Sequence, residues 1–358
     1  MKEAIVAAGP KVTLQDVPIP KPNADQVLIK VVYSGSNPKD WKRPQLGEPH
    51  NSGDDISGVV EAVGENVVEF KKGDRVAAFH EMMAPSGSFA EYALAWDYTT
   101  FHLPKKTTFE EGATIPLAAM TAAIGLYMRL GLPEPWHATT TQTPLIVYGA
   151  SGAVGAYAIK LAQASNIHPI IAIAGRAQDF VEKLIDRSKG DTIIDYRKGD
   201  DAVVSGIQDA LKKAGAKEVH HAFDAVSEHN SFQNISKVLA PQGSKITLVL
   251  PGKDYSAIPE NIKHSTTMVG SVHMDVEPDS YKGKAGIKTG GKEFGYVFFR
   301  LFSRGLQQGW FTPHPHEVVP GGLNGVEKAL SNLKNGVNSA TKYVFKIEDT
   351  TGAGESKM

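Results

Sequence analysis

The spacing of apolar residues predicts two kinds of structure along the chain. In roughly the first hundred residues the apolar runs are short, alternate with polar residues, and are separated by glycine and proline. This pattern is typical of short strands in a small β barrel or sandwich. The runs that carry the prediction are residues 4–8, 12–17, 27–32, 53–64, 73–78 and 87–92.

From Leu145 onward, apolar strand-like runs alternate with helical patterns. This alternation predicts a doubly wound parallel sheet with helices on its faces. A helix with a break near Pro116 and a proline-rich surface loop at 132–144 precede it. A helix over 294–308, a turn at 313–317, a helix over 326–333 and a strand over 342–347 follow. We expect the polar tail from about residue 349 to be disordered.

A glycine-rich turn at 149–155 lies between the first of these strands and an alanine-rich helix. Read from Ala150, it is the dinucleotide-binding fingerprint with alanine for its first glycine. Gly149, Gly152 and Gly155 would allow the sharp turn, the approach of a pyrophosphate to backbone N–H groups, and close packing of the helix on the strand. The pyrophosphate would bind at the helix N-terminus. A plain strand–turn–helix is the alternative.

The end of the next strand, over 169–174, indicates which cofactor would bind. An acid there would accept a hydrogen bond from the ribose of NAD, whereas an arginine suits the 2′-phosphate of NADP. Arg176 lies at this position and no acid does. Asp179 is further along, where a helix cap is expected. The sequence therefore favours NADP(H), with a solvated surface arginine as the alternative.

Composition narrows the class of protein. The chain has 358 residues, a net charge of −1 and no cysteine. Its length allows two domains, and the charge gives no sign of nucleic acid or an anionic membrane as a partner. The absence of cysteine excludes disulfides, thiolate catalysis and a Cys-ligated zinc. No apolar run is long enough to span a membrane and no signal-peptide pattern is present, so we expect a cytoplasmic protein.

These landmarks, in this order, resemble the medium-chain dehydrogenase/reductase superfamily. The resemblance covers nearly the whole chain and rests on residues 73–76, 87–92, 149–155, 321–323 and 342–345. It implies a β-rich GroES-like catalytic domain split by an inserted Rossmann-type domain that binds the cofactor. The expected bounds are 1–118 for the first part of the catalytic domain, 119–290 for the NADP-binding domain and 291–358 for the return.

The metal positions of the zinc-dependent branch are altered in this chain. Asn37 stands where that branch has its first cysteine ligand, Asp54 and Asp55 stand for His-Glu, and the third cysteine falls near Leu117. Neighbouring side chains in a strand point to opposite faces, so Asp54 and Asp55 would not hold one cation together. We expect no metal. The pairs His220-His221 and His314-Pro-His316 are interpreted as solvated turn histidines.

Within the zinc-free branch, the chain resembles fungal trans-acting enoyl reductases of the lovastatin type and similar toxin-cluster reductases. The run 37–42, Asn-Pro-Lys-Asp-Trp-Lys, and the loop at 132–144 are the most discriminating features. Residues that the resemblance implies for the cofactor are Lys39, Asp40, Trp41, Lys42, Ser151, Gly152, Ala153, Val154, Gly175, Arg176, Ala177, Gln178, Tyr196, Leu248, Val249, Ser339 and Ala340. Those implied for the substrate cavity are Thr121, Ala122, Ala123, Ile124, Gly125, Leu126, Tyr127, Met128, Met268, Val269, Gly270, Ser271 and Val272.

The chemistry that this implies is reduction of a C=C bond conjugated to a carbonyl. Without a Lewis acid, the enzyme must position the nicotinamide and offer a donor to the carbonyl oxygen on which charge develops. Lys42 is the candidate donor, serving the cofactor ribose, the enolate oxygen or a water, and Thr121 could also donate. A surface lysine and a hydroxyl bonded to its own helix are the respective alternatives.

Three functions follow from the sequence. The first is an NADPH-dependent enoyl reductase, acting on thioesters carried by a polyketide synthase. The second is a detoxifying quinone or enone reductase, because the glycine turn has the regular form found in quinone reductases. The third is a non-catalytic protein that binds NADPH and a partner. The resemblance leaves a monomer and a homodimer both open.

Overall fold

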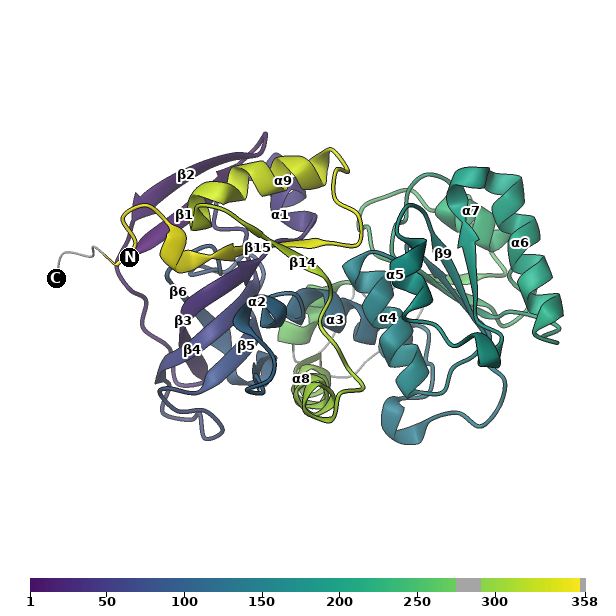
Figure 1. The fold of residues 1–358 in the computed structure, drawn as a ribbon, viewed down its shortest axis with the longest axis horizontal. Coiled ribbons are helices and arrows are strands. Elements are labelled where there is room, and N and C mark those ends of the chain that lie inside the picture. Colours follow the sequence, from purple (N-terminus) through teal and green to yellow (C-terminus); the bar gives the residue numbers. More distant parts are fainter. Residues whose placement is uncertain (275–290, 355–358) are drawn as a thin grey trace. The chain divides into compact units, whose positions relative to one another are not determined.

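The computed structural model describes residues 1–274 and 291–354. The chain forms two compact units, drawn in Figure 1. Unit 1 consists of Met1–Leu117 together with Gly291–Met358, and unit 2 of Ala118–Gly290. Unit 1 is therefore built from both ends of the chain, and each unit is described here by itself.

Unit 1 is organised around a seven-stranded sheet. Its strand order is β14-β15-β3-β4-β5-β7, and β6 also pairs with β3. All these pairs are antiparallel except the parallel pair of β14 and β15. The strands are β3 (Gln26–Gly35), β4 (Asp55–Val63), β5 (Arg75–Phe79), β6 (Tyr92–Trp96), β7 (Thr100–His102), β14 (His316–Val319) and β15 (Lys342–Lys346). A separate hairpin joins β1 (Lys2–Ala7) and β2 (Lys11–Asp16).

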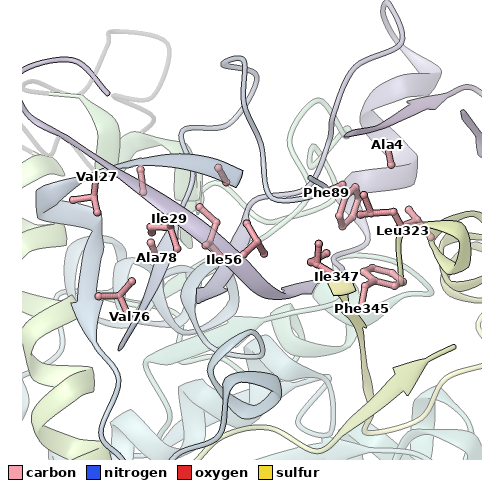
Figure 2. Packing of buried hydrophobic residues seen from close by; sticks show 14 of the residues in the cluster. Ala4, Val27, Ile29, Ile56, Val76, Ala78, Phe89, Leu323, Phe345 and Ile347 are labelled. Carbon is pink, nitrogen blue, oxygen red and sulfur yellow. The ribbon is translucent and has the colours of Figure 1, made fainter. Parts of the chain in front are cut away.

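Apolar residues from both ends of the chain form one core in unit 1 (Figure 2). Ile29 and Ile56 on the central strands are fully buried. The ring of Phe345, on β15, meets that of Phe89 edge-on with centroids 5.5 Å apart. Burial of this apolar surface fixes the C-terminal strand against the N-terminal part of the chain.

Unit 2 contains a six-stranded sheet in which every neighbouring pair is parallel. The strand order is β10-β9-β8-β11-β12-β13, so the direction of winding reverses between β8 and β11. This is the doubly wound Rossmann order, which confirms the expected fold class. The strands are β8 (Leu145–Tyr148), β9 (Ile170–Ala174), β10 (Thr192–Asp195), β11 (His221–Asp224), β12 (Lys245–Leu248) and β13 (Lys263–Thr266).

The helices follow the predicted pattern closely. The expected break near Pro116 separates two of them, and a π-helical turn over Ile124–Arg129 follows the second. The α-helices are α1 (Lys39–Lys42), α2 (Phe109–Gly112), α3 (Pro116–Ala123), α4 (Ala153–Ala164), α5 (Gln178–Glu182), α6 (Asp200–Lys213), α7 (Ser231–Ser236), α8 (Gly291–Gln308) and α9 (Val326–Lys334).

Several local predictions were wrong. The run 87–92 is irregular until β6 begins at Tyr92, and the short strands β7 and β13 were not predicted. His314 is buried rather than solvated, and its backbone N–H donates to Thr114 Oγ1 at 3.2 Å. His221 lies within β11, where burial and then Lys245 lower its pKa to about 4.

The tail that we expected to be disordered from about residue 349 is held to the fold through Gly354. Thr350 is buried, and its Oγ1 accepts the backbone N–H of Leu323 at 2.9 Å. The backbone N–H of Gly354 donates to Glu91 at 2.7 Å. A polar sequence can be ordered where its polar groups find partners. Residues 355–358 lie outside the described part of the chain.

Candidate active site

The glycine turn of unit 2 has the local geometry expected of a dinucleotide-binding turn. Gly149 has a φ of +79°, which a residue with a side chain rarely adopts. A Cβ atom on Gly155 would lie 2.3 Å from the carbonyl oxygen of Gly149, so α4 packs against the turn without room for a side chain. Gly152 is the N-cap of α4, and a Cβ there would have no contact closer than 3.4 Å. Ser151 to Val154 thus span the start of a helix, where backbone N–H groups are available to an anion.

A second turn, at the carboxyl end of the neighbouring strand β11, packs on the first. A Cβ on Gly149 would meet Val226 Cγ2 at 2.7 Å. The fully buried carboxylate of Asp224 holds this turn: it accepts the backbone N–H groups of Val226 and Ser227 at 3.0 and 2.8 Å and the hydroxyl of Ser231 at 2.6 Å. Ser227 has a φ of +58°, a strained value for a residue other than glycine. The carboxylate therefore maintains a backbone shape that the sequence alone disfavours.

Burial of Asp224 gives the fold a testable pH dependence. Burial raises the pKa of this carboxyl from 3.8 to about 6. Because the unfolded chain ionises first, the stability that this group contributes is complete below pH 4 and is lost as the pH rises through 6. Relative to Asp224→Asn, the wild-type free energy of unfolding should fall by about 3 kcal/mol over this window. Urea titrations of both proteins at several pH values measure the difference, and a difference independent of pH would contradict the prediction.

The residues predicted to contact the adenosine half of the cofactor lie close together after β9 and β10. A Cβ on Gly175, after β9, would lie 2.6 Å from the ring of Tyr196, after β10, so the ring covers this glycine. Gln178 donates to Asp195 Oδ2 at 2.8 Å, and Arg197 donates to the same carboxylate at 2.6 Å. The hydrogen bond from Arg197 holds the pKa of Asp195 well below its usual range. Arg176 is exposed at the end of β9.

The segment predicted to line the substrate cavity, 121–128, is almost entirely buried. Gly125 packs on the ring of Phe223, which a Cβ would meet at 2.2 Å. The hydroxyl of Tyr127 donates to the carbonyl of Leu161 at 3.0 Å. Burial raises the pKa of this hydroxyl above its usual value. Thr121, at the middle of α3, is 6% exposed. Most of this segment therefore lies in the protein interior, and its contact with a substrate stays a prediction.

The remaining predicted residues lie at strand ends and in turns. Leu248 is buried at the end of β12, and the backbone N–H of Val249 donates to Ser227 Oγ at 3.0 Å. Residues 268–272 form a short 3-10 turn after β13. Ser339 and Ala340, in unit 1, precede β15, and Ala340 has a φ of +47°. Backbone values of this kind often accompany functional turns.

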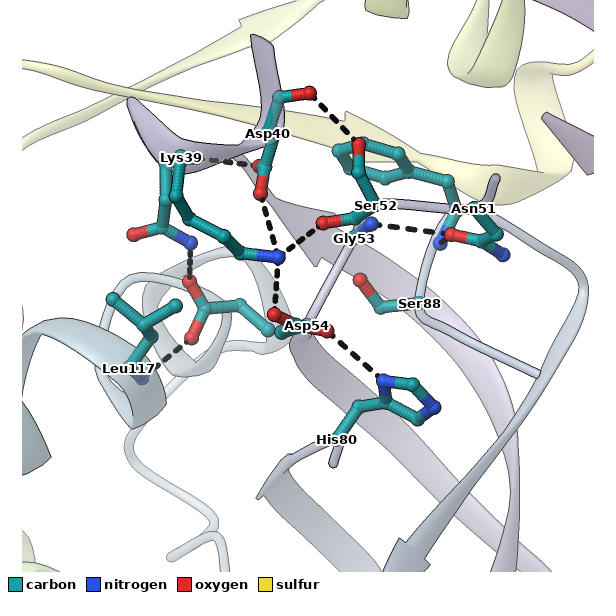
Figure 3. A network of polar contacts seen from close by, with 12 residues as sticks. Lys39, Asp40, Asn51, Ser52, Gly53, Asp54, His80, Ser88 and Leu117 are labelled. Atoms are coloured by element: carbon teal, nitrogen blue, oxygen red, sulfur yellow. Dashed lines mark hydrogen bonds and ion pairs between the residues drawn. The ribbon is translucent and has the colours of Figure 1, made fainter. Parts of the chain in front are cut away.

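In unit 1 the run 37–42 contains the one-turn helix α1, which spans its last four residues. Lys42 is half-buried, with Nζ 5.5 Å from the centroid of the Trp41 ring. Trp41 packs against the core of unit 1. Lys39 lies in a buried set of side chains formed with Asp40, Asp54 and His80, here called the charge cluster (Figure 3). Two lysines three positions apart therefore have different surroundings.

The carboxylates at the zinc-ligand positions are paired with lysine ammonium groups. Asp54 forms an ion pair with Lys39, while Asp55 forms one with Lys342 at 2.5 Å. Asn37 donates to Asp55 Oδ2 at 2.6 Å. Within residues 1–274 and 291–354, no group of three or more His, Cys, Asp or Glu side chains could hold a metal ion. Lysine ammonium groups thus balance the carboxylates at these positions.

Sequence reasoning missed two functional features. Lys342 was noted only as the start of a strand, and Asp224 only as part of a strand end. A charged residue at the end of an apolar run is the signal that could have identified each of them, because such a group is buried only with a partner.

No helix among the described residues is long and apolar enough to cross a membrane.

Residues 23–105 match the family model of the alcohol dehydrogenase GroES-like domain. These residues lie within unit 1.

Comparisons with known proteins cover almost the whole chain. A Gibberella fujikuroi protein, trans-enoyl reductase fsr4, is 52% identical over 330 residues, covering 91% of this chain and 92% of that protein. Trans-enoyl reductase ACTTS2 of Alternaria alternata is 29% identical and covers 96% of this chain and 98% of its own.

Solved structures share the fold at lower identity. The CurK enoyl reductase superimposes with a TM-score of 0.71 at 18% identity, covering 96% of this chain and 98% of that one. An alcohol dehydrogenase superfamily protein from Novosphingobium aromaticivorans gives 0.76 at 20% identity, with 97% and 99% covered. With the fold and the relative at 52% identity together, the chain belongs to the fungal trans-enoyl reductases of the medium-chain dehydrogenase/reductase superfamily.

Proposed function

We propose that the protein is an NADPH-dependent, metal-free reductase of a C=C bond conjugated to a carbonyl. Its substrate is an enoyl thioester presented by a polyketide synthase. The observation that carries this proposal is the 52% identity to trans-enoyl reductase fsr4 across nine-tenths of both chains. The intact glycine turn and the doubly wound sheet support a nicotinamide cofactor.

The adenosine end of unit 2 supports NADPH over NADH. Asp195 is the register partner of Ala174, the last residue of β9, and its carboxylate is engaged by Arg197 and Gln178. It is therefore poorly placed to accept the two ribose hydroxyls of NADH. Exposed Arg176 offers a guanidinium to a 2′-phosphate instead. Tyr196, lying over Gly175, would contact the adenosine.

The chemistry of the residues at the three zinc-ligand positions supports a reaction without zinc. An amide, a carboxylate already paired with an ammonium and a leucine stand at the three ligand positions, Asn37, Asp54 and Leu117. Zinc prefers thiolate and imidazole ligands. Bound NADPH supplies the hydride. The protein must then stabilise negative charge on the carbonyl oxygen and deliver a proton to the α carbon.

Lys42 is the residue to which we assign the donor role. An ammonium carries three donors and a full positive charge, so it can stabilise an enolate oxygen strongly. The nearby Trp41 ring limits the positions that this side chain can take. Thr121 is a second candidate donor to the carbonyl.

The first experiment measures NADPH oxidation with an enoyl thioester, a small enone and a quinone in parallel. Turnover of the thioester well above the quinone supports the proposal. Faster turnover of the quinone would favour the second candidate, a detoxifying reductase, which the regular glycine turn supports. NADPH binding without any turnover, together with a stable complex with another protein, would favour a non-catalytic role.

Replacing Lys42 by methionine should lower kcat for the enoyl thioester by about a hundredfold, the typical cost of one transition-state donor. The KM for NADPH should change little, because the nucleotide half is held by unit 2. The matched control is Lys71→Met, at an exposed lysine of the same unit, which should retain wild-type kinetics. Equal kcat values for Lys42→Met and the control would remove Lys42 from the mechanism.

A further inference from the structure

The ammonium of Lys39 lies among three oxygen acceptors. It lies 3.0 Å from Asp40 Oδ1 and contacts Asp54 Oδ2 and the carbonyl oxygen of Ser52 (Figure 3). An ammonium has three N–H groups. Three oxygen atoms of unit 1 therefore surround this ammonium, although Lys39 lies in the same turn as Lys42.

The acceptors of Lys39 also hold the rest of the α1 turn. Asp40 Oδ2 accepts the backbone N–H of Asn37 at 2.7 Å, and the hydroxyl of Ser52 donates to the carbonyl of Asp40 at 3.0 Å. The side chains of Asp40 and Asp54 are 0% and 1% exposed. The turn is therefore attached, through buried charges, to the segment that leads into β4.

His80 extends this attachment to a further segment. Its Nδ1 lies 2.9 Å from Asp54 Oδ1, and its Nε2 lies 3.0 Å from the carbonyl oxygen of Pro85. Both ring nitrogens therefore lie against oxygen atoms of other segments. Through Asp54, the charge cluster joins Lys39 and the α1 turn to the segment at Pro85.

We propose that Lys39 and Asp54 are positioning residues, whose buried ion pair fixes the α1 turn and thereby the location of Lys42. The inference rests on the proposed function, in which Lys42 is the donor. Lys42 and Lys39 share one helical turn, closed by hydrogen bonds from Lys42 N to Pro38 O at 3.3 Å and from Arg43 N to Lys39 O. A change in the attachment at Lys39 is therefore transmitted to Lys42 through a single turn of backbone.

The kinetic test compares Lys39→Met, Asp54→Asn and the double variant with wild type. Each single variant should lower kcat for the enoyl thioester by about 10- to 100-fold, since small misplacements of a catalytic group are that costly, with little change in the KM for NADPH. The double variant removes one charge of each sign, so its thermal stability should return towards wild type while kcat stays low. Recovery of kcat along with stability would show a purely structural role and overturn the proposal.

A second measurement reports the position of Lys42 without turnover. Its ammonium lies near the Trp41 ring, so the methyl signals of ¹³C-dimethylated Lys42 should carry a ring-current shift, assigned by comparison with Lys42→Arg. This shift should change in Lys39→Met and stay unchanged in Lys72→Met, which breaks only an exposed ion pair with Glu61 in the same unit. An unchanged shift in Lys39→Met would overturn the proposal. A changed shift in an enzyme that reduces no enoyl substrate would contradict the proposed function alone.

Discussion

Replacing Lys342 by methionine is expected to lower the free energy of unfolding by about 3 to 5 kcal/mol, the usual cost of leaving a buried charge without its partner. The ammonium of Lys342 is 3% exposed and lies 2.5 Å from Asp55 Oδ2. It also donates to Asn37 Oδ1 at 3.2 Å. Methionine keeps much of the apolar stem but leaves the carboxylate of Asp55 without its counter-charge.

The effect should be large because Asp55 joins distant parts of unit 1. Its other oxygen accepts the backbone N–H of Leu117 at 2.7 Å, and Lys342 is 287 positions away in the sequence. Chemical denaturation followed by fluorescence measures the change. The control is Lys346→Met on the same strand, whose ion pair with exposed Glu348 should contribute less than about 1 kcal/mol. Similar losses for the two variants would show that burial does not set the value of the Lys342 pair.

Two alanine substitutions in the glycine turn should separate folding from cofactor binding. Gly155→Ala places a Cβ 2.3 Å from the carbonyl oxygen of Gly149, and the contact is with backbone on a packed turn. Alanine gains up to about 1 kcal/mol of helix propensity over glycine. Overpacking of this kind costs about 3 kcal/mol, so a net loss of stability is expected.

Gly152→Ala should instead change the stability of the fold little and weaken NADPH binding. Its Cβ would lie 3.4 Å from the carbonyl oxygen of Gly149, an ordinary van der Waals contact, so the fold should lose only about 1 kcal/mol, the cost of alanine at an N-cap. The methyl group would instead stand where we expect the pyrophosphate to approach the backbone, and NADPH should bind about tenfold more weakly, or ~1.4 kcal/mol. Calorimetric titration with NADPH and thermal melts of both variants provide the comparison. Unchanged NADPH affinity in Gly152→Ala would place the pyrophosphate elsewhere.

The sequence was most informative where local pattern decides structure. The glycine spacing at 149–155, between an apolar strand and an alanine-rich helix, predicted the turn and the close packing at Gly155 that the structure contains. Alternation of strands and helices after Leu145 predicted the parallel sheet. The sequence was less informative about irregular segments: β7 is only three residues long, and the tail is ordered through contacts such as that of Thr350 with Leu323.

The sequence by itself predicted the fold class and the glycine turn, because these depend on residue spacing within a few turns of helix or strand. Its resemblance to known reductases indicated the family. Only the tertiary structure decided how the charged residues are paired. Asp54 and Asp55 are neighbours in sequence, yet one binds Lys39 and the other Lys342. The free energy of a buried charge depends on which opposite charge lies within a few ångströms. That distance is set by how the sheet brings distant segments together, so no local pattern could show that Lys39 pairs with Asp54 and Lys342 with Asp55.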